Sequence, residues 1–395
     1  MTTRPPSAGV NVSRAPSPDT GDLDGGGGRV CLGEAAAACR IREASFDDYQ
    51  GIAALQRRNG LAPRSYALWS ALWLSNPAYC PGTPIGWVIE TPGGEIGGYV
   101  GNLPLAYWFK DRYLRAATVY SWAADAAFRG YSLALVDRLV RQPGIDLIVC
   151  TTPNEPASRV YSAYRFRRIP QGQWDKCWFW ITGYRGFARG ALRSAGFPWA
   201  GALAHPVAAA LCVRDGIAGR RLPASGEDFE FADSFDARFD RFWEEMIAQK
   251  SERLLAVRDC RTLRWHFGAS LAAGDAWILT AARGERLVAY AILDRQDHSA
   301  LELRRIRFVD FQALDGFEHL LGAALARAIE QARTERAHVL ENAGCWLGQW
   351  GAAAPYRRSL KTWGFLYKAR QEDLAGELED AAVWAPSAFD GDASL

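Results

Sequence analysis

The chain has 395 residues, of which 49% are hydrophobic and 23% are charged, and its formal net charge is +2. This composition is ordinary for a globular protein, and the length suggests two or three domains. Lys and Arg are spread along the chain without a basic run, so the charge pattern argues against nucleic acid as a partner.

The cysteines and histidines are scattered. No two of the eight Cys stand in CxxC spacing, and the five His form no HxxxH or HExxH pair. Zinc sites in proteins need such clustered ligands. We therefore expect no metal, and we expect single Cys residues to be reduced thiols in a chain without an export signal.

The N-terminal stretch and one apolar stretch indicate where in the cell the protein is expected. Residues 1–38 are expected to be a disordered tail, because their beginning is rich in Gly, Pro, Ser and Thr and lacks the apolar core of a signal peptide. The apolar stretch 197–213 is broken by Pro198 and Pro206 and is shorter than the ~20 residues that a membrane span requires. We expect a helix between domains there, no membrane span and a cytoplasmic protein.

The first half of the chain predicts a β-α-α-β-β-β-α-β-α-β order. Alternating or continuous apolar runs predict the strands, and 3.6-residue periodicity predicts the helices. Asn154 is a suitable N-cap for a helix whose first turn contains Pro156. The main expected elements are strands at 39–44, 86–91, 96–108, 113–126 and 145–152, and helices ending at Arg58 and over 64–74, 132–142 and 155–165.

The second half predicts the same order again, although few residues repeat. A stretch around "WGAAAPYRRSLKTW", residues 350–363, is expected to be partly helical. Repetition of one supersecondary order indicates two copies of an α/β unit with a mixed sheet. The expected organisation is a tail at 1–38, a first domain at 39–184, a linker at 185–226, a second domain at 227–372 and a loose tail at 373–395.

Two motifs in the first half carry a family resemblance. Arg129, Gly130 and Ala134 fit the pattern [RQ]-x-x-G-x-[GA], with Ser132 at its central glycine. The pattern N-x-x-A-x-x-x-Y-x-x-x-G-F follows. Asn154, Ala157, Tyr161 and Phe166 match this pattern, and Arg165 replaces its glycine. With the order of elements, these motifs resemble the GNAT acetyltransferase superfamily, in tandem. The resemblance covers residues 39–181 by motif and 227–370 by topology.

The resemblance implies an acyl-CoA co-substrate, usually acetyl-CoA. In such a fold the helix beginning near Ser132 presents unpaired amides and a partial positive charge to the pyrophosphate. An ordinary strand-to-helix turn is the alternative. The residues expected to contact the co-substrate are Ala124, Arg129, Gly130, Tyr131, Ser132, Leu133, Ala134 and Asn154; Asn154 could also serve only as a helix cap.

Two residues are candidates for the proton transfers. The resemblance implies that Tyr161 protonates the departing thiolate, although it could instead pack only on the sheet. Asp125, at the end of the strand before the loop, could accept the proton of an amine, or it could be a solvated strand-end residue.

The second copy departs from the family pattern. Residues 312–315, Gln-Ala-Leu-Asp, stand where the phosphate loop belongs, and Leu360 stands at the tyrosine position, although Gly364-Phe365 matches the motif. We expect this copy to brace the first domain or to wall the acceptor site without binding acyl-CoA.

Three functions remain open from the sequence. The first is an N-acyltransferase acting on a small-molecule or sugar-linked amine, and the second is a non-catalytic acyl-CoA sensor. The third is a relative of the tandem-GNAT aminoacyl transferases that modify cell-wall precursors, against which the phosphate-loop motif in the first half argues. Leu263–Phe267 is separately similar to a helix in GNAT-like proteins of bacterial polysaccharide clusters. Trp346, Trp350 and Trp363 could stack on a sugar or fill a core. The oligomeric state is not determined by the sequence.

Overall fold

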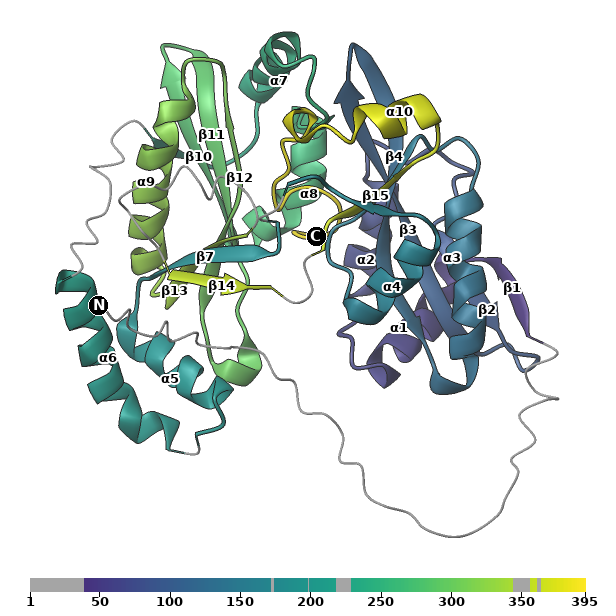
Figure 1. The fold of residues 1–395 in the computed structure, drawn as a ribbon, viewed down its shortest axis with the longest axis horizontal. Helices are drawn as coiled ribbons and strands as arrows, with labels where there is room; N and C mark the ends of the chain where they lie inside the picture. Colours follow the sequence, from purple (N-terminus) through teal and green to yellow (C-terminus); the bar gives the residue numbers. More distant parts are fainter. Residues whose placement is uncertain (1–38, 172–173, 198, 218–228, 344–355, 361–363) are drawn as a thin grey trace, which may run out of the picture. The chain divides into compact units, whose positions relative to one another are not determined.

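A computed structural model describes residues 39–171, 174–197, 199–217, 229–343, 356–360 and 364–395 (Figure 1). The expected tail at 1–38, part of the expected linker and Trp346, Trp350 and Trp363 lie outside these residues.

The chain divides into two compact units, and neither is continuous in sequence. Of the described residues, unit A comprises 39–171, 239–269 and 364–395, and unit B comprises 174–197, 199–217, 229–238, 270–343 and 356–360. The units differ from the expected linear division at 39–184 and 227–372. The physical reason is that segments distant in sequence complete each sheet.

The sheet of unit A has, among the described residues, eight strands in the order β1-β2-β3-β4-β5-β15-β6, with β9 paired to β3. Its strands are β1 (Arg40–Glu43), β2 (Gly86–Glu90), β3 (Ile96–Phe109), β4 (Arg112–Ala124), β5 (Leu147–Cys150), β6 (Arg167–Arg168), β9 (Leu255–Ala256) and β15 (Leu366–Ala369). Strands β1 to β4 form an antiparallel meander, and β5 then pairs parallel to β4.

Helices cover both faces of this sheet (Figure 1). α3 (Ser132–Arg141) and α4 (Glu155–Ala163) pack on one face, in a core with Ile89, Ala117 and Cys150. α1 (Tyr49–Arg58) and α2 (Tyr66–Leu74) pack on the other, in a core that includes Tyr99. The remaining helices of this part of the chain are α7 (Ala237–Gln249), α8 (Cys260–Ala272) and α10 (Glu372–Glu377).

Strands β4 and β5 part from each other after a short paired stretch. Their register covers Ala116–Thr118 against Leu147–Val149, whereas β4 continues to Ala124 in pairing with β3. β4 also contains a bulge, where Ser121 adopts φ +55°. A bulge bends its strand and increases the local twist, which suits the parting of the two strands.

Strand β15 shows why the two halves of the sequence cannot be separated. It lies between β5 and β6, with Leu366 opposite both Cys150 and Arg168. The Gly364-Phe365 pair that resembled a motif of the second copy therefore leads into the sheet of unit A. Phe365 is buried there, and its carbonyl accepts a hydrogen bond from the amide of Ile169.

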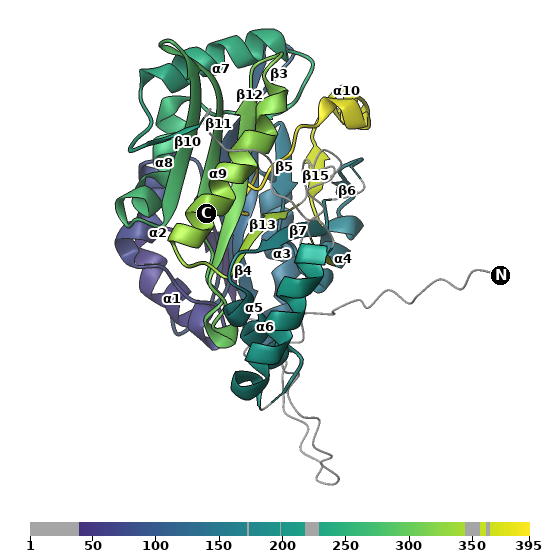
Figure 2. The same ribbon diagram turned by 90° about the vertical axis from the view of Figure 1, so that its left-hand side faces the viewer.

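The sheet of unit B is completed in the reciprocal way. Its order is β14-β7-β13-β12-β11-β10-β8, and β7 (Lys176–Ile181) from the first half of the sequence lies between β14 (Tyr356–Ser359) and β13 (Val339–Ala343). The other strands are β8 (Glu230–Ala232), β10 (Ala276–Arg283), β11 (Arg286–Arg295) and β12 (Arg305–Ala313). Figure 2 shows α9 (Leu321–Thr334) lying along this sheet, where Leu325 and Ile329 enter its core.

Three segments differ from the sequence expectation. Tyr356–Ser359, expected to be helical in part, forms β14. The expected linker begins with a helix that was not expected, α5 (Tyr184–Ser194), whereas α6 (Ala200–Ile217) lies where a helix was expected. The expected loose tail at 373–395 includes α10 and the buried residues Trp384 and Ala388. Within the described residues, no helix combines the length and the apolar character needed to span a bilayer.

Candidate functional site

A cavity of about 750 Å³ lies in unit A where β4 and β5 part. The end of β4, the residues that follow β5 and the start of α4 supply most of its wall. The lining residues are Asn59, Leu61, Val119, Ser121, Trp122, Ala123, Ala124, Arg129, Ser132, Cys150, Thr151, Thr152, Pro153, Asn154, Pro156, Ala157, Val160, Tyr161 and Asp392. Of the residues predicted from sequence, this cavity brings together Ala124, Arg129, Ser132, Asn154 and Tyr161.

The loop after β4 has a different conformation from the one expected. Residues Ala126–Tyr131 form a 3-10 helix that leads directly into α3, since Tyr131 is itself in a helical conformation. The amide of Ser132 donates to the carbonyl of Arg129, and the amide of Phe128 donates to that of Asp125. The i→i+3 bonds of a 3-10 helix use these amides within the chain, so the expected convergence of unpaired amides at 130–134 is not observed.

The helical conformation also explains the departure from the motif at Ser132. The Ser132 φ angle is −63°, which any residue adopts, so no glycine is required there. Its hydroxyl donates to the Arg129 carbonyl at 2.6 Å. A Cβ added to Gly130 would meet nothing within 4 Å of the protein. The glycine is thus not demanded by packing within the chain.

The other predicted loop residues lie outside the cavity lining. Tyr131 ends the 3-10 helix, and Leu133 and Ala134 lie in the first turn of α3. The Leu133 side chain is exposed, and its carbonyl accepts a hydrogen bond from the Tyr164 hydroxyl at 3.0 Å.

Asp125 is held by α1 rather than aimed into the cavity. Its carboxylate forms an ion pair with Arg58 at 2.8 Å and accepts a hydrogen bond from the Asn59 amide at 3.0 Å. It is not among the lining residues of the cavity. Both carboxylate oxygens contact these partners. The Asp125 side chain therefore links the end of α1 to the start of the 3-10 helix.

Helix α4 positions Asn154 and Tyr161. The Asn154 side-chain oxygen accepts the amide hydrogen of Ala157 at 2.9 Å, which confirms the predicted N-cap. Two turns later Tyr161 is buried, with its ring 5.7 Å from that of Trp122 and 5.1 Å from that of Phe166. Burial raises the pKa of Tyr161 well above its ordinary value, and the nearby Cys150 and Asp392 add to this effect. The phenol therefore stays protonated at neutral pH.

The end of α4 shows why the motif has glycine followed by phenylalanine. Arg165 has φ +61°, a left-handed conformation that glycine adopts more easily. The amide of Phe166 donates to the Tyr161 carbonyl, and the amide of Arg165 donates to that of Ser162. These are the two bonds of a Schellman motif, which typically brings together the side chains that here are Tyr161 and Phe166.

Asp392 is a cavity residue that the sequence analysis missed. Thr151 donates a hydrogen bond to its carboxylate at 2.7 Å, and Thr152 contacts both of its oxygens at 3.1 and 3.0 Å. Burial raises the pKa of Asp392, and the two threonine hydroxyls oppose that rise. The sequence offered a weak signal, a Gly-Asp pair after an apolar run, in a segment that was expected to be loose.

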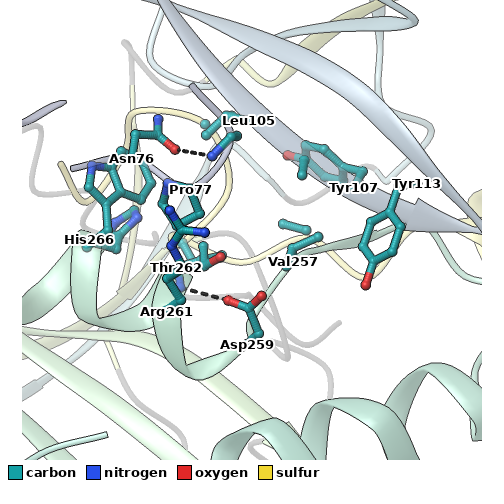
Figure 3. A pocket seen from close by; sticks show the side chains of 16 residues that line it. Asn76, Pro77, Leu105, Tyr107, Tyr113, Val257, Asp259, Arg261, Thr262 and His266 are labelled. Atoms are coloured by element: carbon teal, nitrogen blue, oxygen red, sulfur yellow. Dashed lines mark hydrogen bonds between the residues drawn. The ribbon is translucent and has the colours of Figure 1, made fainter. Parts of the chain in front are cut away.

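A second cavity, of about 220 Å³, also lies in unit A (Figure 3). Tyr107 and Tyr113 of the β3–β4 hairpin line one part of it, and Thr262 and His266 of α8 line another. Gly391 also lines this cavity, so the segment that brings Asp392 to the larger cavity forms part of the wall of the smaller one.

In unit B, the residues expected to replace a phosphate loop lie at the end of β12 and after it. Gln312 and Ala313 are the last residues of the strand, and Asp315 precedes Gly316, which has φ +85°. Within the part of the chain that the structure describes, no group of three or more His, Cys, Asp or Glu residues is arranged to hold a metal ion.

No protein-family model matches the sequence, and no curated protein matches it. Solved structures do match. A probable N-acyltransferase from Enterococcus faecalis V583 aligns with a TM-score of 0.53 and 12% identity, over 84% of this chain and 72% of that one. A GCN5-related N-acetyltransferase from Anabaena variabilis gives 0.51 and 10%, over 85% and 73%.

A third match is N-myristoyltransferase of Saccharomyces cerevisiae, whose structure contains myristoyl-CoA. It aligns with a TM-score of 0.52 and 9% identity, over 84% of this chain and 80% of that one. At such low identity the likeness concerns the fold. The chain has the mixed α/β fold of the GCN5-related N-acetyltransferases.

Proposed function

We propose that the protein is an N-acyltransferase in which unit A transfers an acyl group from acyl-CoA, with acetyl-CoA the first candidate, to an amine. The observation that carries the proposal is the cavity between the parting strands, with Arg129, Asn154 and Tyr161 in its wall. These residues come from both motif stretches. The fold likeness to acyltransferases, one of them bound to myristoyl-CoA, supports the same reading.

The cavity residues suit the parts of such a co-substrate. Arg129 is an exposed cation at the rim of the lining and would pair with a phosphate group. The exposed side of Asn154 would contact the amide-containing arm of acyl-CoA, while its side-chain oxygen caps α4. Tyr161 lies deepest of the three and is protonated, so it would donate its proton to a sulfur anion that forms there.

The acceptor in this proposal is a small-molecule or sugar-linked amine. Its nitrogen attacks the thioester carbonyl carbon, the C–N bond forms and the C–S bond breaks. The nitrogen loses protons while the sulfur gains one, so the site must both accept and donate protons. Positioning of the two reactants in one cavity supplies a further part of the rate increase.

Isothermal titration calorimetry with acetyl-CoA and longer acyl-CoA esters, followed by thiol release with a panel of amines, tests the proposal. We expect saturable binding and amine-dependent thiol release. Binding with no thiol release for any amine would favour the second candidate, a non-catalytic acyl-CoA-binding protein. The engagement of Asp125, the base expected from sequence, by Arg58 and Asn59 is the observation that favours this alternative. Absence of binding contradicts both candidates.

A further inference from the structure

The carboxylate of Asp392 lies in unit A and has no role in the mechanism proposed above. It lines the larger cavity, and the residue before it lines the smaller one. Two hydroxyl donors, from Thr151 and Thr152, hold it at the end of β5. The amide of Asp392 also donates to the Thr151 hydroxyl oxygen at 3.2 Å, so backbone and side chain are fixed together.

The neighbouring residues keep the segment in this place. Gly391 has φ +67°, and a Cβ added there would lie 2.5 Å from the Thr151 hydroxyl oxygen. Asp390 accepts hydrogen bonds from the Tyr107 hydroxyl at 2.9 Å and from the Ser387 amide at 2.7 Å. The His266 ring and the Ser394 hydroxyl are 2.8 Å apart. Positions on both sides of Asp392 are thus bound to the body of unit A.

We propose that Asp392 is the general base that accepts a proton from the acceptor amine, an inference that rests on the acyltransferase function proposed above. Asp125, the base expected from sequence, is engaged by Arg58 and Asn59 and does not line the cavity. Asp392 lines it and faces the same cavity as Tyr161, so the proton acceptor and the proton donor share one site.

The proton balance of the step is as follows. The ammonium form of the acceptor gives one proton to Asp392, and its nitrogen lone pair then forms the C–N bond as the C–S bond breaks. Tyr161 gives its proton to the sulfur and takes the second proton that the nitrogen loses. Asp392 finally returns its proton to water, so the net products are the amide, free CoA thiol and one proton.

The surroundings of Asp392 favour this role. The titratable groups near it are Cys150 on β5, Tyr161 on α4 and Tyr120 on β4, and Arg129 lines the same cavity. Burial raises the pKa of Asp392, and that of each of these two tyrosines and of Cys150 is raised as well, so all three stay neutral. A carboxylate among neutral groups is a stronger proton acceptor than one paired with a cation.

The test compares Asp392→Asn with two aspartate controls. Asp390→Asn alters a buried carboxylate of the same segment that does not line the larger cavity, and Asp137→Asn alters a carboxylate of α3 that pairs with Arg141 on the surface. Thermal melting and acyl-CoA calorimetry first establish that each variant is folded and binds. We expect Asp392→Asn to lower kcat/KM for the amine by at least about 100-fold, and Asp137→Asn to leave it unchanged.

Two further readouts separate a base from a structural residue. The loss in Asp392→Asn should shrink with weakly basic amines, which are already neutral at the assay pH, and the acidic limb of the pH profile should disappear. Asp390→Asn should keep both the limb and the dependence on amine basicity, even where it lowers stability. An equal loss for all amines, or an unchanged pH profile, overturns the proposal.

A titration without acyl-CoA completes the test. Carboxyl ¹³C NMR of the protein should show Asp392 titrating above the ordinary aspartate range, and Thr152→Ala should move it higher, because a donor to the carboxylate is lost. Thr152→Ser keeps a hydroxyl donor, so the Asp392 carboxyl should titrate there as it does in the wild type. An Asp392 carboxyl that titrates in or below the ordinary range overturns the inference. Absence of thiol release in the wild type overturns the proposed function as well, whereas release at the wild-type rate in Asp392→Asn overturns this inference alone.

Discussion

The Tyr161 phenol is buried between Trp122 and Phe166 and is part of the wall of the larger cavity. Packing accounts for an aromatic ring at this position, and the proposed chemistry adds a role for its hydroxyl. Its ring fills the core beside α4, and in the proposed mechanism its protonated hydroxyl would serve the leaving sulfur.

Tyr161→Phe separates these two roles, because phenylalanine keeps the ring and removes the hydroxyl. We expect kcat to fall by about 100-fold, with the dissociation constant for acyl-CoA and the melting temperature nearly unchanged. Tyr164→Phe is the matched control, since that hydroxyl donates to the Leu133 carbonyl outside the cavity. Thiol-release assays on both variants check this, and an unchanged kcat in Tyr161→Phe would remove the hydroxyl from the mechanism.

Arg129 is the cation of the cavity rim, so it should contribute to binding rather than to chemistry. Arg129→Ala should weaken acyl-CoA binding by about tenfold, the equivalent of ~1.4 kcal/mol, because an exposed charge pair is partly screened by solvent. Arg138→Ala, on the exposed side of α3, should leave affinity unchanged. Calorimetry at two salt concentrations provides the measurement. Equal losses in both variants would indicate a non-specific charge effect.

At the scale of single elements, the end of α4 carries a residue that its conformation does not favour. Arg165 occupies the left-handed position of a Schellman motif. Burial lowers the pKa of Lys368, and the nearby charge of Arg165 lowers it further. The departure from the family glycine therefore affects stability and leaves the position of Tyr161 intact.

Arg165→Gly should raise the free energy of unfolding by about 0.5–1 kcal/mol, because the left-handed strain is relieved while glycine loses more chain entropy on folding. Arg165→Ala keeps a Cβ in the same conformation and also removes the charge, so it serves as the control and should give no comparable gain. Chemical denaturation of the two variants measures the difference. A gain of equal size in both would assign the effect to the charge near Lys368.

The loop after β4 behaves differently from α4. At Ser132 the missing glycine is without consequence, since the helical conformation suits any residue. Local patterns predicted that a helix starts there, and it does. They did not show that the six preceding residues would also be helical, because a 3-10 turn depends on the contacts that Phe128 and Asp125 make with β3 and α1.

At the scale of the whole molecule, each unit contains strands from both halves of the sequence. Unit A needs β15 between β5 and β6, and it needs α8 and the segment that carries Asp392. Residues 39–184, a plausible domain from sequence, lack all three. That fragment would leave Cys150, Tyr161 and their neighbours without the contact of Leu366.

We expect the fragment 39–184 to be unfolded or aggregated when expressed alone. A chain in which residues 39–172, 239–269 and 362–395 are joined by flexible linkers should fold cooperatively, because it restores the whole sheet of unit A. Circular dichroism and thermal melting of the two proteins test this. A fragment 39–184 that melts cooperatively would show that β15 is dispensable.

The sequence by itself determined what depends on near neighbours: the order of the elements apart from α5 and β14, the Asn154 cap, the helix containing Tyr161 and the fold class. Periodicity and capping are local, so they can be read from a single chain. Only the tertiary structure decided which strands complete which sheet, that Asp125 is bound by Arg58 and that Asp392 reaches the cavity. These are contacts between residues far apart in sequence, and no local pattern encodes the partner of a strand or of a carboxylate.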